Sequence, residues 1–345
     1  MKKYFFSFLL TAFCMVINAQ SKTGKPYLTK SLSGQSVNNV MVETAGGNIT
    51  VEGVADAETR LEIYVSASNN RLNALSAEEI RKKVNEDYDL NISVTDNRLT
   101  ATAKSKEKIH DWKRSLTFSF KIYVQQNAGT DLTTSGGNIQ LKNLTGTENF
   151  TTSGGNLVVE NVGGKIKGIT SGGNINLLNS KDDIDLTTSG GNITADNSSG
   201  DISITTSGGT LKLQGLNGKI HGSTSGGNID GEGIHGEFVA STSGGNIVLD
   251  NMYGSVDAAT SGGNIHATIK ELGKYLTLSN SSGNIDVQVP NKGMDLKLSA
   301  NKIKTETLNN FIGEKDDDEL AGTINGGGIP VKINAGSGKI SLSFN

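Results

Sequence analysis

Cysteine is almost absent from this chain: the single Cys among 345 residues is Cys14, close to the N-terminus. Without a second cysteine, no intramolecular disulfide can form. If the N-terminal segment is removed on export, as argued below, the remaining chain also has no thiol available for chemistry.

Proline and aromatic residues are also scarce. There are 3 Pro beside 44 Gly, aromatic residues make up 5 % of the chain, and apolar residues make up 34 %. A disordered linker of this glycine content usually carries proline as well. Abundant glycine with little proline therefore favours tight turns between ordered strands.

The first 19 residues have the pattern of a secretion signal. Lys2 and Lys3 precede an apolar stretch over 4–17, and Asn18-Ala19-Gln20 offers a cleavage site after Ala19. The apolar stretch is short for a membrane span, although an N-terminal anchor is the alternative. Phe13 directly before Cys14 does not suit a lipoprotein site. We expect an exported protein, at the cell surface, extracellular or periplasmic.

The charge of the mature chain argues against nucleic acid as a partner. The formal net charge is −3 and becomes −5 when Lys2 and Lys3 are lost, because −3 − 2 = −5. A mildly acidic protein lacks the basic surface that binds phosphate backbones. No second apolar run is long enough to span a bilayer, so we expect no transmembrane segment after signal cleavage.

One four-residue motif, Thr-Ser-Gly-Gly, which we call the word, recurs at a fixed spacing. Its Thr stands at positions 134, 152, 170, 188, 206, 224, 242 and 260, which is 18 residues apart each time. A constant period of this length marks a stacked repeat, in which each unit is one turn of a solenoid.

Two stretches of each unit alternate apolar and polar residues, as half-buried strands do. The first begins with an aliphatic residue in all eight units: Ile139, Leu157, Ile175, Ile193, Leu211, Ile229, Ile247 and Ile265. The second begins at Ile166, Ile184, Ile202, Ile220, Phe238 and Val256, and only Glu148 departs from this column. The sequence predicts an all-β fold, a β-solenoid (β-helix or β-roll) with 18-residue, two-strand rungs.

The turns of the unit carry glycine and asparagine. We expect the Gly-Gly pair to supply backbone angles that other residues reach only with strain. A following Asn recurs at positions 138, 156, 174, 192, 228, 246 and 264, with Thr210 as the exception, and a second column holds Asn143, Asn161, Asn179, Asn197 and Asn251. Stacked rungs would let each amide donate to the next in a ladder, and we favour this structural role over ligand binding.

The segments that flank the repeat are less regular. Strand-like runs cover 61–66, 90–94, 99–103 and 116–124, and "TAGGNITVEG" at 44–53 carries one variant of the word. Ser76 with Glu79 predicts a capping box, and Ile80 and Val84 would face inward from the helix it starts. We divide the chain into a signal peptide (1–19), an N-terminal β-rich cap with one short helix (20–133), a regular β-solenoid (134–277) and irregular C-terminal rungs with a cap (278–345).

The candidate catalytic and metal-binding motifs all have a structural interpretation. Calcium rolls need an Asp where this repeat has aliphatic residues such as Leu141. Glycan-active enzymes need clustered carboxylates and commonly a cation for anionic sugars, but no Arg follows Arg114. Asp182, Asp183, Asp185 and Asp201 form the best acidic cluster, but Asp183 and Asp201 are flanked by Lys165 and Lys219 one rung away, as in a solvated charge ladder. The acidic run 314–319 reads as an exposed loop more than a cation site, and His221, His235 and His266 fall at different positions of the repeat. We expect no catalytic residues, metal or cofactor.

Two features keep a binding interpretation open. Thr133, Thr151, Thr187 and Thr205 alternate with Ser135, Ser153, Ser189 and Ser207 on an outward face, which could meet carbohydrate or ice. Ile169 and Ala259 interrupt this array, and turn and strand chemistry also accounts for it. Trp112, the only tryptophan, is either part of the cap's core, which we favour, or a ligand platform.

The same residues carry a resemblance to a known family. The leader, "TAGGNITVEG", the serial "TSGGNI" words and the closing "INGGGIPVKINAGSGKISLSF" resemble the adhesin-like family of bacterial exported β-solenoid proteins, a domain of unknown function. The resemblance implies surface attachment through an unidentified glycan or protein ligand, without catalysis. Alternatives are a periplasmic or envelope scaffold that supports or senses and, more weakly, a glycan-active enzyme.

Overall fold

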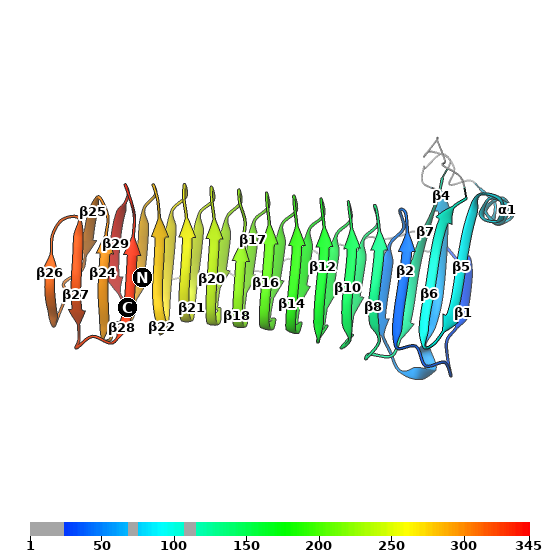
Figure 1. The fold of residues 1–345 in the computed structure, drawn as a ribbon, viewed down its shortest axis with the longest axis horizontal. Helices are drawn as coiled ribbons and strands as arrows, with labels where there is room; N and C mark the ends of the chain where they lie inside the picture. The colour runs from blue at the N-terminus through cyan, green and yellow to red at the C-terminus, as the bar shows by residue number, and fades with distance from the viewer. Residues whose placement is uncertain (1–23, 68–74, 107–114) are drawn as a thin grey trace, which may run out of the picture.

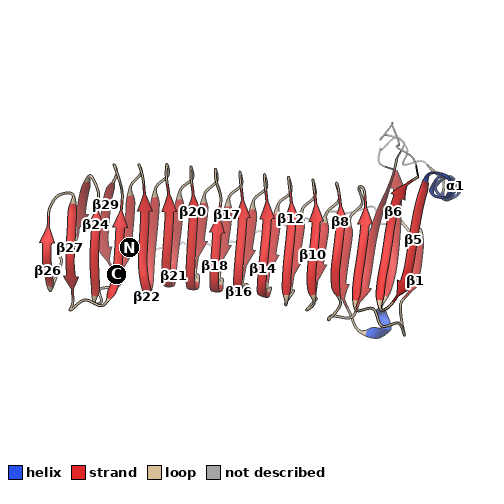
Figure 2. Cartoon of the chain, viewed as in Figure 1, coloured by secondary structure: helices blue, strands red, loops and turns tan. Residues whose placement is uncertain are grey.

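The computed structural model describes residues 24–67, 75–106 and 115–345. The predicted signal peptide over 1–19, with Cys14, lies outside these residues, and so does Trp112. Within them the fold is almost entirely β, with one α-helix, so the predicted fold class is confirmed (Figure 2).

The strands form two parallel columns that run along the whole molecule (Figure 1). Column A contains β8 (Gly129–Thr134), β10 (Thr147–Thr152), β12 (Lys165–Thr170), β14 (Lys181–Thr188), β16 (Ser199–Thr206), β18 (Asn217–Ser223) and β20 (His235–Thr242). Column B contains β9 (Ile139–Lys142), β11 (Leu157–Glu160), β13 (Ile175–Leu178), β15 (Ile193–Asp196), β17 (Leu211–Gln214) and β19 (Ile229–Glu232). β21 (Ile247–Thr260) and β22 (Ile265–Asn280) are long enough to contribute to both columns.

Neighbouring strands of a column pair in parallel with the register that the repeat predicts. Thr152 lies opposite Thr170 in column A, and Ile193 lies opposite Leu211 in column B. Inward side chains alternate with outward ones along each strand and are almost completely buried. Two-strand rungs with an 18-residue period are therefore confirmed.

Core volume is balanced between neighbouring rungs. Gly168 faces inward, and the ring of Phe150 and a methyl group of Leu186 occupy the space that a side chain at position 168 would need. Phe238 fills the same kind of space beside Gly222 and Gly231. Large residues thus compensate for the glycines, as close packing requires.

The Gly-Gly corner is built for close approach and not for unusual backbone angles. The second glycine of each word packs against the carbonyl of the same glycine in the preceding rung, so a Cβ on Gly155 would overlap Gly137 O. Neither glycine of the pair has a positive φ in these corners. The expected reason for the pair was therefore wrong, because the constraint is the spacing between rungs.

An asparagine ladder follows this corner, with a different donor from the predicted one. Asn138 Oδ1 accepts from the backbone N–H of Asn156 at 2.8 Å, and the same bond recurs up the stack. The side-chain carbonyl thus binds the next rung's backbone, whereas we expected amide-to-amide donation. The ladder continues beyond the regular repeat, from Asn48 at one end to Lys339 N at the other.

The opposite corner is where left-handed backbone occurs. Asn143, Asn161, Asn179, Asn197 and Asn251 all have φ between 49° and 56°, and Gly215 and Gly233 take the same conformation at 61° and 60°. Asparagine tolerates this region better than other side chains do. The second asparagine column is thus a backbone requirement, supplemented by one amide-to-amide bond from Asn161 Nδ2 to Asn143 Oδ1 at 3.2 Å.

The N-terminal end of the stack is made by an excursion of the chain. β2 (Asn39–Thr44) and β3 (Ile49–Gly53) form a rung beside β8 and β9, and β6 (Arg98–Ser105) and β7 (Leu116–Val124) form the next rung outward. Antiparallel strands β5 (Tyr88–Thr95), β4 (Arg60–Ala67) and β1 (Leu28–Ser31) close this end. The predicted strands and the rung-like "TAGGNITVEG" are confirmed.

The one α-helix, α1 (Ala77–Asp87), lies at this end and starts as predicted. Glu79 N donates to Ser76 Oγ at 3.2 Å, and Ser76 N donates to Glu79 Oε2 at 2.8 Å, which is the expected capping box. Val84 is buried and Ile80 packs against the core, also as expected. A short 3-10 turn, η1 (Asp56–Glu58), precedes β4.

The C-terminal end is also made by an excursion of the chain. β23 (Ile285–Val289) completes the rung of β22, but the next rung outward is the last in sequence, β28 (Ile329–Asn334) with β29 (Lys339–Phe344). β24 (Met294–Ser299) and β25 (Lys302–Thr305) lie outside it, and antiparallel strands β27 (Glu319–Ile324) and β26 (Phe311–Lys315) end column A. Antiparallel strands from an excursion thus close both columns at the N-terminal end and column A at the C-terminal end.

Candidate functional site

The inward threonine of each word is the most regular polar feature of the stack, and the sequence did not reveal its role. Thr152 Oγ1 donates to Gly137 O at 2.9 Å and accepts from Gly155 N–H at 3.3 Å. The same pair of bonds recurs at Thr170, Thr188, Thr206, Thr224, Thr242 and Thr260. These buried hydroxyls link successive corners, so they stabilise the scaffold and cannot contact a ligand.

The predicted hydroxyl array does lie on the outer face of column A. Thr133 and Thr151 are exposed, and Thr187 and Thr205 are half-buried, while the serines of the words are exposed at the corner. Ile169 interrupts the row with 39 % of its surface exposed. The array is therefore a narrow row of small side chains on a flat surface.

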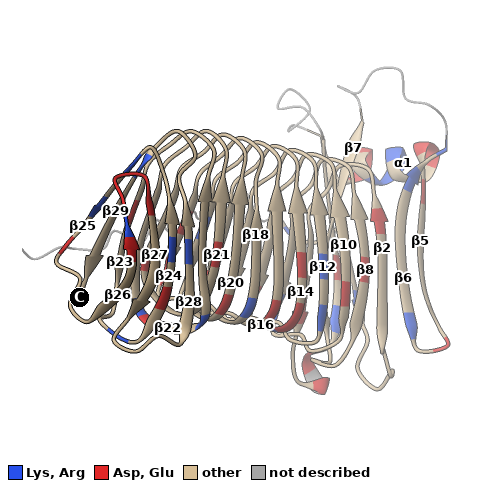
Figure 3. Cartoon of the chain, turned by 60° about the vertical axis from the view of Figure 1, so that its left-hand side comes forward, with Lys and Arg blue, Asp and Glu red and all other residues tan. Residues whose placement is uncertain are grey.

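The acidic residues singled out from the sequence do not converge. Asp183 lies opposite Asp201 on neighbouring strands, while Asp182 is turned to the corner, where its Oδ2 accepts from Gly164 N at 2.9 Å. Lys165 approaches Asp183 at 4.0 Å, as the predicted charge ladder requires. Figure 3 shows Lys, Asp and Glu interspersed along the strands of the stack.

The acidic loop and the histidines are also apart from one another. Asp316 to Asp318 form the exposed turn of the β26–β27 hairpin. His221 lies in column A, His235 stacks on Tyr253 with ring centroids 4.4 Å apart, and His266 Nδ1 lies 3.4 Å from Asp286 in column B. Among the described residues, no group of three or more His, Cys, Asp or Glu side chains could hold a metal ion.

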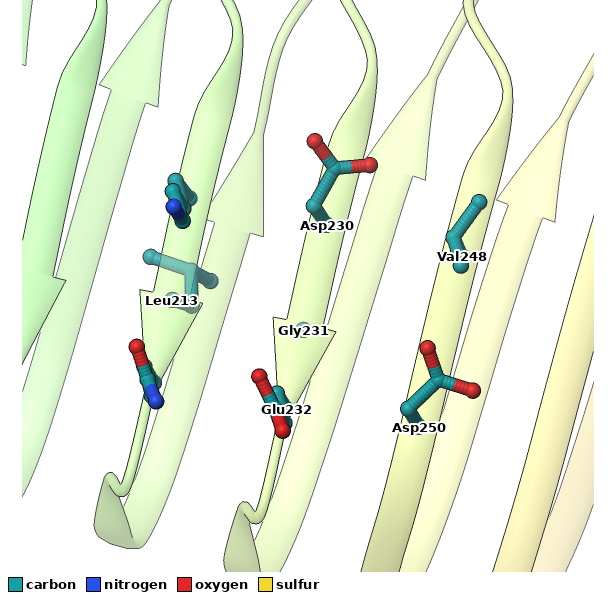
Figure 4. A pocket seen from close by; sticks show the side chains of 8 residues that line it. Leu213, Asp230, Gly231, Glu232, Val248 and Asp250 are labelled. Carbon is teal, nitrogen blue, oxygen red and sulfur yellow. The ribbon is translucent and has the colours of Figure 1, made fainter. Parts of the chain in front are cut away.

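A shallow concavity lies on the outer face of column B, across β17, β19 and β21 (Figure 4). Asp230 and Glu232 project from β19, and Asp250 projects from the neighbouring β21. Lys212 and Gln214 from β17 complete the polar rim, and Val248 adds one apolar side chain. The inward-facing Leu213 and Gly231 line the floor between these outward side chains. Its volume is about 230 Å³, and it is partly open to solvent.

Charge around this concavity, which we call the column-B dip, is unevenly paired. In register, Lys212 lies opposite Asp230, and Glu232 lies opposite Asp250. One cation thus stands beside three carboxylates, so the dip is acidic. One rung away, burial raises the pKa of Asp196 above its ordinary value, and Lys212 partly opposes this shift. The dip can contact hydroxyl, amide or cationic groups of a ligand surface.

A second concavity lies near the N-terminal end, beneath Tyr88 and Phe118. Their rings are 4.9 Å apart, and Tyr88 Oη accepts from Leu116 N–H at 2.7 Å. Burial is the main cause that raises the pKa of Tyr88 above its ordinary value. This tyrosine therefore fixes the packing between β5 and β7.

Among the described residues, Glu148 is the one carboxyl group that lies inside the core. It is 0 % exposed at a position that is apolar in the later rungs, and Thr130, its partner on the preceding rung, donates from Oγ1 to its Oε2 at 2.6 Å. Its Oε1 has no hydrogen-bond partner among the described residues. Burial raises the pKa of Glu148 to about 7, against the opposing bonds from Thr130 and Gly146. Solvent cannot reach this group, so it cannot meet a substrate.

The described residues contain no helix that is long and apolar enough to cross a membrane. This finding applies to α1, which has 11 residues and a largely polar surface.

Comparison with known proteins identifies a family. A family model described as Toastrack DUF4097 matches residues 119–343, which include the regular rungs and the C-terminal end. No curated protein matches the chain.

Two solved structures are similar at low identity. One is described as a "putative adhesin" from Bacteroides fragilis, with 18 % identity, a TM-score of 0.36, and coverage of 73 % of this chain and 92 % of that chain. The other is a "putative cell adhesion protein" from Clostridium sporogenes, with 11 % identity, a TM-score of 0.19, and coverage of 92 % of this chain and 98 % of that chain.

Proposed function

The chain belongs to the Toastrack DUF4097 family, and on this premise we propose that it is an exported, non-catalytic scaffold that attaches to a surface glycan or protein in the manner of an adhesin. The contact surface is the outer face of column B, centred on the column-B dip.

The observation that carries the proposal is the fixed register of outward side chains. Asp196, Gln214, Glu232 and Asp250 occupy one row on four successive strands. Neighbouring strands in a sheet are about 4.8 Å apart, so the row presents polar groups at a constant spacing on a rigid surface. Such a row suits a ligand that is itself extended or repetitive, because several weak contacts then act together.

The placement of the carboxyl groups supports a role without catalysis. General acid–base chemistry needs a carboxyl of raised pKa that can reach a substrate. Glu148 is the carboxyl with the large upward shift, and it is sealed in the core. The carboxylates of the dip lie on an open surface that does not enclose a substrate.

Binding to intact cells tests the contact surface. Purified, labelled chain carrying Asp230→Asn, Glu232→Gln and Asp250→Asn should bind at least about 10-fold more weakly than the parent chain, since each lost polar contact contributes about 1 kcal/mol. The matched control removes three carboxylates from column A through Asp183→Asn, Asp185→Asn and Asp201→Asn, and should bind like the parent. Equal weakening by both sets would show that net charge, and not the dip, governs binding.

Protease treatment of intact cells tests the location. When protease is added to cells whose outer membrane is intact, we expect the chain to be degraded. Survival until the outer membrane is opened would contradict attachment at the surface and favour the alternative of an envelope scaffold in the periplasm.

A further inference from the structure

The ends of the stack are the places where a strand has only one neighbour. β1 and β5 occupy this position at the N-terminal end, and β25 and β26 occupy it at the C-terminal end. Unpaired strand edges offer N–H and C=O groups to any extended segment. The four edges differ in how far the rest of the fold covers them.

The edge of β25 is covered by the acidic turn. Ile303 N donates to Asp317 O at 2.7 Å, and Ala300 N donates to Asp318 O at 3.0 Å. The turn that follows β26 thus folds back over β25 and occupies the backbone donors of Ile303 and of Ala300 just before the strand. β26 remains as the open edge at this end.

The backbone groups of β26 that face outward can be assigned from its pairing with β27. Asn325 N donates to Asn310 O at 3.3 Å, and Asp316 N donates to Glu319 O at 2.8 Å. In an antiparallel pair the hydrogen-bonded residues alternate, so Ile312 and Glu314 also bond toward β27. The N–H and C=O groups of Phe311, Gly313 and Lys315 therefore point to the open edge, where the described residues supply no further strand.

An apolar side chain marks this edge as a contact. Three large apolar side chains of the described residues are exposed, Ile169, Leu178 and Ile312, with exposed fractions of 39 %, 37 % and 77 %. Ile169 and Leu178 lie within the columns, flanked by strands on both sides. Ile312 lies on the open edge strand, where a second strand would cover it.

Charge selects the direction in which a second strand of the same sequence would pair. Three consecutive acidic residues, Asp316 to Asp318, directly follow β26. Parallel pairing would set the two acidic runs side by side, where like charges repel. Antiparallel pairing places each run opposite the uncharged residues Leu308 to Asn310 of the other copy.

We propose that β26 pairs antiparallel with β26 of a second copy of this chain, about a two-fold axis at Gly313. This register pairs all three outward-facing residues, with Gly313 opposite Gly313 and Phe311 opposite Lys315. Ile312 then lies beside the aliphatic stem of Glu314 from the second copy. The product is a tail-to-tail dimer in which the two stacks join at their C-terminal ends and the N-terminal caps lie at the far ends.

The interface is small, so the association is weak. Five residues a side fall well below the area of a stable protein interface, and a dissociation constant on the order of 100 µM is expected. The dimer does not depend on the proposed attachment function, although two identical faces on one particle would strengthen binding to a surface by avidity.

Sedimentation equilibrium tests the association. The mature chain should show a reversible monomer–dimer equilibrium between about 1 µM and about 1 mM, concentrations that bracket the expected constant. Ile312→Lys should raise the dissociation constant at least about 10-fold, and the matched control Ile169→Lys should leave it unchanged. A monomer throughout, or a dimer that Ile312→Lys leaves intact, would overturn the proposal.

Cysteine cross-linking tests the register, because the mature chain contains no other cysteine. In the proposed pairing, positions 312 and 314 form a non-hydrogen-bonded pair with Cα atoms about 4.5 Å apart, within the range of a disulfide. The double variant Ile312→Cys, Glu314→Cys should form a covalent dimer under mild oxidation. The control Lys167→Cys, Ile169→Cys places the two cysteines on the outer face of β12, which has a neighbouring strand on each side, and should remain monomeric. Equal cross-linking in the two variants would reject the β26 pairing.

Discussion

Glu148 is the residue at which side-chain chemistry and position conflict most strongly. Its pKa of about 7 in the folded chain exceeds its ordinary value of 4.5, because burial disfavours the carboxylate. The folded state therefore holds the proton more tightly than the unfolded state does. The contribution of Glu148 to stability is therefore highest below about pH 4.5, falls as the pH rises toward 7, and is constant above that range.

We expect Glu148→Gln to abolish this loss of stability at rising pH. A shift of this size corresponds to roughly 3 kcal/mol between about pH 4.5 and about pH 8. The variant should match the parent near pH 4.5 and exceed its free energy of unfolding by about 2–3 kcal/mol near pH 8. Urea denaturation at the two pH values measures this difference. Asp185→Asn, on the half-buried outer face, is the control and should change neither value by more than about 0.5 kcal/mol.

Asp182 is the residue that occupies a glycine position. Its φ is 84°. The equivalent position in other rungs is glycine with φ between 92° and 138°, at Gly164, Gly200, Gly218, Gly236 and Gly254. Both Asp182→Ala and Asp182→Gly lose the hydrogen bond to Gly164 N. Only glycine relieves the backbone strain, so the glycine variant should be about 1 kcal/mol more stable than the alanine variant. Equal thermal stability of the two would show that this corner carries no strain.

At the scale of the element, the corner that joins the two columns depends on its second glycine. Gly191→Ala would drive a Cβ into Gly173 O, whereas Gly190 has open space around it, with Ser171 O as its nearest atom at 3.7 Å. We expect Gly191→Ala to lower the free energy of unfolding by more than about 3 kcal/mol, because the backbones of the two neighbouring rungs must move apart. Gly190→Ala should change it by less than about 1 kcal/mol. Thermal denaturation of this matched pair decides whether spacing or backbone angle constrains the corner.

The sequence predicted elements well where their signals are local. Alternation defined the strands, and Ser76 with Glu79 defined the start of α1. The order of rungs at the two ends was out of reach, because β2–β3 and β28–β29 are placed by pairing with strands far away in sequence. The column-B dip was also missed. Periodicity assigns Asp230 and Glu232 to the outer face, but the shape of that face depends on neighbours such as Val248.

At the scale of the whole molecule, the stack is a one-dimensional array in which each rung contacts its two neighbours. Its length should therefore be adjustable in whole units. Deleting residues 189–206 removes β15 and β16 and joins Thr188 to Ser207. Ile184 then lies opposite Ile220, and Asn174 takes the place of Asn192 as the acceptor for Thr210 N.

This 18-residue deletion should fold into a shorter stack that loses only the share of stability contributed by one rung. Deleting residues 198–206 removes β16 alone, so the following strands would fall in the wrong column and turn their apolar side chains to solvent. We expect the first variant to keep its β-type circular dichroism and a cooperative thermal transition a few degrees lower, roughly as a loss of 1–2 kcal/mol predicts. The second should aggregate or fail to fold. Two variants of equal stability would contradict a scaffold whose geometry is set by the register of its rungs.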